Sequence, residues 1–407
     1  MKKHPEPFCP QTPWPLILPS TPHSPLSTPC SSWDIFCAVV DNYGDIGVCW
    51  RLARQLAGER RHTVRLWVDD LTSFARLCPD IDPALEGQAC RGVEVRRWPQ
   101  DFPEVEPGDV VIEAFACALP ESFIKAMAAR TAAPRWINLE YLSAEDWVTG
   151  CHGLPSPHLS LLKYFFFPGF VTGTGGLLLE DGLLQERTTF QADEALRAAF
   201  WRRLDVPSPH PGELRVSLFS YANSATPGLF EAWAASDVPV TCLVPEGTAT
   251  AALVAAEFDV APAPGSVCRR GGLEVRILPF LEQPDYDRLL WACDVNFVRG
   301  EDSFVRAQWA ARPFVWHIYP QEEDAHHVKM EAFLDVYCAD LPGEAAGVVR
   351  GLWRGWNGVS PAGIGEAWRD FQARRPALAA FGPDWAGRLA DLGGLTSNLE
   401  KFVNTRL

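Results

Sequence analysis

The sequence predicts an α/β protein with two Rossmann-like halves, each built on a parallel β-sheet flanked by helices. Short apolar runs typical of buried parallel strands alternate with helical stretches in two series, separated by Pro- and Gly-rich sequence at 151–181. The 407 residues provide enough chain for two or three domains. Because ligands of such sheets bind beyond the carboxyl ends of the strands, we expect a site in a cleft between the halves.

The individual elements follow from the apolar pattern. In the first half an apolar run at 35–40 is followed by a glycine-containing turn and a helix over 46–57, and further strands are predicted at 64–68, 110–112 and 136–138. In the second half strands are predicted at 214–219, 238–244, 273–278, 295–298 and 314–316. The chain ends in helical sequence over 367–381, 384–392 and 395–404. Strands that alternate with helices imply right-handed βαβ units.

Residues 1–32 differ from the rest of the chain because they contain nine prolines and many Ser and Thr residues. Such a segment buries too little apolar surface to offset the entropy of ordering it, so we expect a disordered extension. We assign residues 33–185 to a first Rossmann-like domain, completed by about 370–407, and residues 186–369 to a second.

Composition excludes several classes of protein. The formal charge of −15 argues against broad nucleic-acid binding, and no apolar run approaches the roughly 18 residues of a membrane span. The twelve cysteines are scattered without a C-x-x-C pair, which argues against a zinc ribbon or a disulfide framework. These features predict a cytoplasmic protein that binds neither nucleic acid nor membranes.

The turn after the first strand carries two carboxylates, Asp41 and Asp45, beside Gly44 and Gly47. Carboxylates at this place can accept hydrogen bonds from a substrate, take a proton or bind a guanidinium. They can also be a helix cap and a solvated turn residue. The turn lacks the G-x-G-x-x-G pattern of dinucleotide sites and presents acids where a pyrophosphate would bind, although Asp69 and Asp70 after the second strand favour NAD.

A second group of polar residues follows the strand at 295–298. Glu301, Asp302 and Ser303 open a helix whose N-terminal N–H groups suit a diphosphate. We assign Glu301 to sugar hydroxyls, and a simple helix cap is the alternative. Aromatic and amide side chains also follow strands of this half and are suited to a pyrimidine base: Phe219, Tyr221, Phe280 and Gln283. The His326-His327 pair lacks metal-ligand spacing, so we expect no metal.

Three long segments resemble the protein-arginine rhamnosyltransferases (EarP type) that modify elongation factor P. They read VVDNYGDIGVCWRLARQLA, ILPFLEQPDYDRLLWACDVNFVRGEDSFVRAQWA and PFVWHIYPQ, and the resemblance runs from Trp33 to the C-terminus. It implies a GT-B fold, in which two Rossmann-like domains face a central cleft and C-terminal helices return to the N-terminal domain. It also implies inverting transfer of rhamnose from dTDP-β-L-rhamnose to an arginine of elongation factor P, with no metal or other cofactor.

The resemblance also implies roles for individual residues. Asp41, Asp45 and Glu301 match the catalytic positions. Because a guanidinium is a poor nucleophile, we expect Asp45 to take its proton as the base and Asp41 to position it. The implied donor-binding positions are Asn42, Gly44, Phe219, Tyr221, Phe280, Gln283, Arg299, Asp302 and Ser303. Two alternatives stay open: an NAD-linked doubly wound oxidoreductase, and a non-catalytic protein-binding relative of the same fold.

Overall fold

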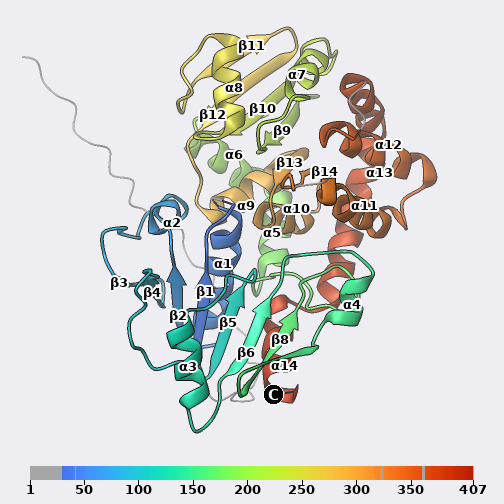
Figure 1. Ribbon diagram of the computed structural model, residues 1–407. Helices are drawn as coiled ribbons and strands as arrows, with labels where there is room; N and C mark the ends of the chain where they lie inside the picture. The colour runs from blue at the N-terminus through green and yellow to red at the C-terminus, as the bar shows by residue number, and fades with distance from the viewer. Residues whose placement is uncertain (1–29, 42, 322–323, 360–362, 407) are drawn as a thin grey trace, which may run out of the picture. The chain divides into compact units, whose positions relative to one another are not determined.

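The computed structural model describes residues 30–41, 43–321, 324–359 and 363–406, and the chain from Ser31 to Leu407 forms one compact unit (Figure 1). Most of the predicted disordered extension, residues 1–29, lies outside the described residues, and so does Asn42. Within the compact unit the strands form two separate sheets.

The first sheet has eight strands in the order β3-β4-β2-β1-β5-β6-β8-β7. Its strands are β1 (Ser32–Cys37), β2 (Thr63–Val68), β3 (Gly87–Cys90), β4 (Val93–Arg97), β5 (Val110–Ala114), β6 (Arg135–Leu139), β7 (Pro155–His158) and β8 (Leu161–Phe166). The two edge strands pair antiparallel with their neighbours, and the other pairings are parallel. The accompanying helices are α1 (Gly44–Gly58), α2 (Leu71–Leu77), α3 (Glu121–Ala129) and α4 (Trp147–Cys151).

The second sheet has six strands in the order β11-β12-β10-β9-β13-β14. Its strands are β9 (Leu214–Leu218), β10 (Val240–Pro245), β11 (Val267–Arg270), β12 (Leu273–Leu278), β13 (Val295–Arg299) and β14 (Phe314–His317), all parallel except β11. Its helices are α5 (Leu183–Ala192), α6 (Glu194–Arg203), α7 (Thr226–Ala234), α8 (Ala249–Phe258), α9 (Gln283–Ala292), α10 (Asp302–Ala310), α11 (Ala325–Cys338) and α12 (Gly343–Trp356).

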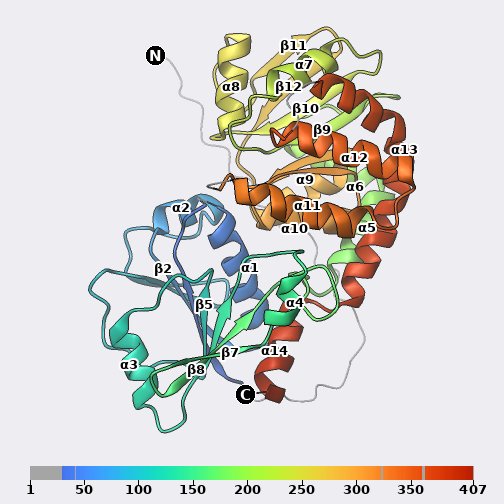
Figure 2. The ribbon, with the colours of Figure 1, turned by 45° about the vertical axis from the view of Figure 1, so that its right-hand side comes forward.

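The last two helices connect the second half back to the first. α13 (Ile364–Asp391) packs against α7, α10 and α12, and α14 (Leu395–Arg406) then lies against α1 (Figure 2). Leu395, Leu399 and Phe402 are buried in the same apolar core as β1 and α1. Burial of this apolar face explains why the terminal helix returns to the first sheet. The two sheets and the returning helix confirm the α/β fold of GT-B type.

Two predicted element boundaries were wrong. The first strand ends at Cys37, its last residue paired with β2, and Val40 is 67% exposed because the chain has left the sheet there. The helices predicted at 367–381 and 384–392 are one helix, α13, with Pro376 and Pro383 inside it. A Cβ at Gly382 would lie 2.6 Å from the carbonyl oxygen of Ala311, so this glycine permits close packing rather than ending the helix.

The order of the strands decides where polar side chains gather. β1 lies between β2 and β5, and β9 lies between β10 and β13, so each sheet has a point at which the connections leave in opposite directions. In open α/β sheets ligands bind at such points, beyond the carboxyl ends of the strands. The segments after β1, β9 and β13 therefore frame the site. No helix of the described part of the chain has the length and apolar character needed to cross a membrane.

Candidate active site

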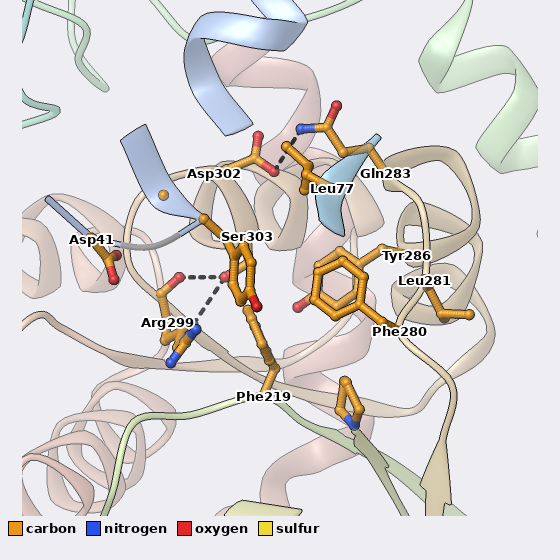
Figure 3. Close-up of a pocket in the computed structure, with 13 residues that line it drawn as sticks. Asp41, Leu77, Phe219, Phe280, Leu281, Gln283, Tyr286, Arg299, Asp302 and Ser303 are labelled. Atoms are coloured by element: carbon orange, nitrogen blue, oxygen red, sulfur yellow. Dashed lines mark hydrogen bonds between the residues drawn. The ribbon is translucent and has the colours of Figure 1, made fainter. Parts of the chain in front are cut away.

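A pocket lies where the carboxyl ends of both sheets approach each other (Figure 3). Eight of the residues predicted from the sequence line it: Asp41, Gly44, Phe219, Phe280, Gln283, Arg299, Asp302 and Ser303. Five further lining residues were not predicted: Tyr43, Leu77, Pro245, Leu281 and Tyr286. Asp45, Tyr221 and Glu301 do not line this pocket, although each contacts the segments that form it.

Asp45 lies in the first turn of α1 and is 4% exposed. Its Oδ2 accepts hydrogen bonds from the backbone N–H groups of Val40 and Asp41, each at 2.8 Å, so the carboxylate folds the loop after β1 back on itself. Burial raises the pKa of Asp45, the two N–H groups lower it, and the nearby charge of Asp41 raises it again, with a net upward shift. A carboxylate with a raised pKa is suited to accepting a proton.

Asp41 connects the two halves at the mouth of the pocket. The hydroxyl of Tyr221, which follows β9, donates to Asp41 Oδ2 at 2.5 Å. Burial and the charge of Asp41 raise the pKa of Tyr221, so this phenol stays a donor. Gly300 lies against the same oxygen: its φ is 58°, and a Cβ there would be 2.6 Å from Asp41 Oδ2. Only glycine fits this close approach without strain.

Arg299, at the end of β13, places a positive charge in the pocket. Its guanidinium carbon lies 4.4 Å from the ring centroid of Phe219 and 4.6 Å from that of Tyr221. Packing against two aromatic faces orients the guanidinium through cation–π contacts. The arrangement leaves a fixed cation beside the helix start that follows β13.

Aromatic rings and one amide form the side of the pocket suited to a base. The ring of Phe280 lies 5.0 Å from the ring of Tyr43, at an interplanar angle of 51°. Gln283, 4% exposed, donates from Nε2 to the carbonyl oxygen of Gly47 at 3.0 Å and accepts at Oε1 from Arg54 at 2.9 Å. In this structure residues of the first half therefore engage the amide assigned to the base and pack against the ring.

The start of α10 provides the site suited to a phosphate group. Asp302 is its first residue, and Oδ1 of Asp302 accepts from Arg51 Nε at 2.8 Å. The Ser303 hydroxyl accepts from the backbone N–H of Arg299 at 3.0 Å and donates to the carbonyl oxygen of Arg299, as the dashed lines of Figure 3 show. Ser303 thereby ties the helix start to the end of β13. N–H groups at a helix N-terminus attract anions.

Glu301 lies beside the pocket, and two groups hold its carboxylate. Oε2 accepts from the backbone N–H of Leu142 at 3.1 Å, and Oε1 accepts from Lys329 Nζ at 3.3 Å. Burial raises the pKa of Glu301, although Lys329 opposes the shift. Lys329 Nζ also lies 5.5 Å from the ring centroid of Tyr141, whose pKa is raised by burial and by the charges of the nearby acids. One carboxylate can accept about four hydrogen bonds, so Glu301 can still accept one from a sugar hydroxyl.

Some of the functional residues that the sequence analysis missed had a recognisable signal in the sequence, and others had none. Tyr43 stands between the two aspartates of the turn, so its position was a signal. Arg51 is a charged residue at a buried position of α1, and this break in the apolar pattern was a second signal. Leu77, Pro245 and Leu281 look like ordinary apolar residues, and only the fold brings them to the pocket.

Among the described residues two groups have ligand atoms close enough to share a metal ion. One is Asp324, His326 and His327, and the other is Cys78, Asp80 and Cys90; in each the ligand atoms lie within 4.8 Å of one another. From the sequence no metal-ligand spacing was found around the His326-His327 pair, and Asp324, which the fold brings close to both histidines, was not considered. None of these six residues lines the pocket described above.

The chain is similar to proteins of one family along nearly its whole length. The family model described as "Elongation-Factor P (EF-P) rhamnosyltransferase EarP" matches residues 33–404. The protein-arginine rhamnosyltransferase of Pseudomonas putida KT2440 is 50% identical over 378 residues, which cover 93% of this chain and 100% of that protein. The protein-arginine rhamnosyltransferase of Pseudomonas aeruginosa PAO1 is 50% identical over 374 residues, covering 91% and 98%.

One solved structure is similar over the same region. It is described as "Structural basis for EarP-mediated arginine glycosylation of translation elongation factor EF-P" and has a TM-score of 0.66 with 37% sequence identity. The match covers 93% of this chain and 100% of that chain. Sequence and fold therefore indicate the same relatives.

Proposed function

This chain belongs to the family of EF-P rhamnosyltransferases of the EarP type, and from that membership we propose that it transfers L-rhamnose from dTDP-β-L-rhamnose to an arginine side chain of EF-P. The observation that carries the proposal is the family match over residues 33–404, which includes every residue of the pocket. This match favours a glycosyltransferase over an NAD-linked oxidoreductase and over a non-catalytic relative.

The acceptor presents a chemical difficulty that the two aspartates are suited to solve. A guanidinium has a pKa above about 12 and delocalised lone pairs, so it is a poor nucleophile. We assign Asp45 as the base that takes the proton as the C–N bond forms, because its carboxylate is buried and its pKa is raised. Asp41 positions the guanidinium, and the Tyr221 hydroxyl orients Asp41 from the other half.

The donor is assigned to the second half. Phe280 and Phe219 supply ring faces for thymine, and Gln283 supplies an amide for its polar edge. The N–H groups at the start of α10, together with the Arg299 guanidinium, stabilise the negative charge that develops on the departing diphosphate. Glu301 accepts from a sugar hydroxyl. Attack by the guanidinium on the face opposite the leaving group inverts the anomeric carbon.

The contacts of this structure bear on how the donor enters. Gln283 and Phe280 both contact residues of the first half, Gly47, Arg54 and Tyr43. A base that binds between Phe280 and the first half must replace these contacts. We therefore propose that the two halves separate slightly to admit the donor and close again over it.

We further propose that the reaction needs no metal ion and takes place in the cytoplasm. The positive charge that a metal would supply at the diphosphate comes from the α10 start and Arg299 in this proposal. The rate of transfer in the presence of EDTA tests the proposed metal independence. A rate that falls on chelation and returns with added divalent cation would contradict metal independence.

The proposed activity is tested by the intact mass of EF-P after incubation with this protein and dTDP-β-L-rhamnose. We expect a gain of one deoxyhexose, and no gain when the acceptor arginine of EF-P is replaced by Lys. dTDP binding, measured by calorimetry, separates the two substrates. Binding of dTDP without a mass change would keep the nucleotide-sugar assignment and contradict the acceptor. Absence of both would contradict the proposed function.

A further inference from the structure

Arg51 lies in the middle of α1, which packs against α10 of the second half and bonds Asp287 of α9. Its side chain is 2% exposed, and it donates to carboxylates from three places in the chain. Nε donates to Asp302 at 2.8 Å, NH2 donates to Asp287 at 3.1 Å, and NH1 donates to Glu180 at 3.2 Å. Such a guanidinium joins the two halves and the segment that connects them.

A second buried arginine shares two of these carboxylates. Arg306 of α10, 1% exposed, donates to Asp287 through Nε and NH2, both at 2.8 Å, and to Glu180 through NH1 at 2.7 Å. Arg51 NH1 also donates to Asp287, at 3.2 Å, so Asp287 accepts four hydrogen bonds from the two guanidinium groups. The two arginines differ in one respect: Arg51 donates to Asp302, whereas Arg306 donates to Asp287 and Glu180.

Asp302 is the carboxylate in this cluster that reaches the donor pocket. It lines the pocket at the start of α10, and its Oδ2 accepts from Gln283 Nε2 at 3.4 Å (Figure 3). A free carboxylate at this place would repel a diphosphate. The bond from Arg51 places a positive charge at Oδ1, while Oδ2 accepts from the Gln283 amide.

The backbone of α1 is shaped for the same contact. Gly47 precedes Arg51 by one helical turn and lies on the same face. A Cβ at Gly47 would lie 3.2 Å from Asp302 Cβ, so α1 and the start of α10 are at close approach here. The glycine allows the approach, and the arginine one turn later binds the carboxylate that the approach brings near.

We propose that Arg51 is a positioning residue for the nucleotide-sugar donor: through its bond to Asp302 it fixes the carboxylate beside the diphosphate site, offsets part of its negative charge and makes donor affinity depend on the contact between α1 and α10. The inference rests on the proposed function, because it takes a nucleoside diphosphate as the ligand of this pocket. It adds to the donor site a residue of α1 that does not itself line the pocket.

The experiment is dTDP binding by calorimetry to the full-length chain and its variants. We expect R51M to weaken dTDP binding at least tenfold. R51K should weaken dTDP binding less, because it keeps the positive charge. It should still weaken it, since one ammonium cannot bond all three carboxylates in the geometry of a guanidinium. R51K keeps the charge and provides a folded variant if R51M does not fold. In turnover the loss should appear as a raised KM for the donor, with kcat at saturating donor within threefold of the wild type.

R306K is the matched control, because it perturbs the same buried cluster without touching Asp302. We expect R306K to lower the melting temperature about as much as R51K while leaving the dTDP Kd within twofold of the wild type. A double-mutant test isolates the contact: in a D302N background, R51M should change the dTDP Kd by less than threefold.

Three results would overturn the inference. They are an unchanged dTDP Kd in R51K and R51M, an equal loss of affinity in R306K, or a full R51M effect in the D302N background. A wild-type chain that binds no dTDP would instead contradict the proposed function, and this inference with it. The wild-type measurement therefore separates the two failures.

Discussion

Replacement of Asp45 by Asn removes one buried charge beside the pocket and keeps the size of the side chain. Both backbone N–H groups that Asp45 binds, those of Val40 and Asp41, donate to the same oxygen, Oδ2, at 2.8 Å. The amide oxygen of Asn can occupy that position, so the loop after β1 keeps its two hydrogen bonds. The change therefore tests the proton-accepting role more than the fold.

The expected magnitudes follow from these contacts. Removal of a general base lowers kcat by about 10²–10⁴-fold, which corresponds to roughly 3–5 kcal/mol in activation free energy. Stability at neutral pH should not fall. Because burial raises the pKa of Asp45, its ionisation opposes folding, and the stability it contributes below its unfolded pKa is lost as the pH rises through its folded pKa. At neutral pH Asn therefore replaces a charge that does not favour the folded state.

The assay is the rate of EF-P mass gain at saturating donor, together with thermal unfolding and dTDP calorimetry on the same preparations. We expect turnover to be lost in Asp45→Asn with dTDP affinity and melting temperature near those of the wild type. Asp45→Ala serves as a contrast, because it also removes the acceptor of both N–H groups and should lower the melting temperature. The wild-type rate should fall on acidification at a pH above the ordinary range of an aspartate. Turnover of Asp45→Asn within threefold of the wild type would refute the assignment of Asp45 as the base.

Three other changes test separate parts of the site and of the interface. Gly300→Ala should lower the free energy of unfolding by about 1–2 kcal/mol, because it puts a side chain at φ 58°, and should push Asp41 away. We therefore expect lower turnover and a lower melting temperature. A fully active variant would show that the close approach of Gly300 to Asp41 is dispensable. Phe280→Ala should weaken dTDP binding by roughly tenfold or more in calorimetry, since stacking of a base contributes about 1–3 kcal/mol, and an unchanged Kd would reject the stacking role. Burial alone would raise the pKa of Glu180, but Arg306 and Arg51 override it and lower the pKa to about 2. The stability that Glu180 contributes is present above its unfolded pKa and is lost as the pH falls toward 2. In Glu180→Gln the melting temperature should therefore fall less steeply on acidification than in the wild type. An unaltered profile of melting temperature against pH would contradict this role of Glu180.

Local features of the sequence determined much of the fold and part of the site. The apolar run 110–112 lies on β5, whose five residues are all buried, because strands covered on both faces are rich in apolar residues. Asp41 and Asp45 are close in the chain, and a short turn brings them together wherever the rest of the protein lies. By contrast, β3 and β7 are short edge strands with mixed exposure, and their residues carry little apolar signal.

Contacts between distant residues were decided only by the tertiary structure. Tyr221 reaches Asp41 across 180 residues, and Arg51 reaches Asp302 across 251. Neither bond has a local pattern, because a tyrosine after a strand and an arginine on a helix occur in many surroundings. The pairing depends on how the two sheets face each other and on the glycines, Gly47 and Gly300, that let the backbones approach. The sequence by itself determined which chemical groups stand at the ends of the strands, and the packing of the two halves decided which of them meet, because contact energies between distant residues exist only once the chain has folded.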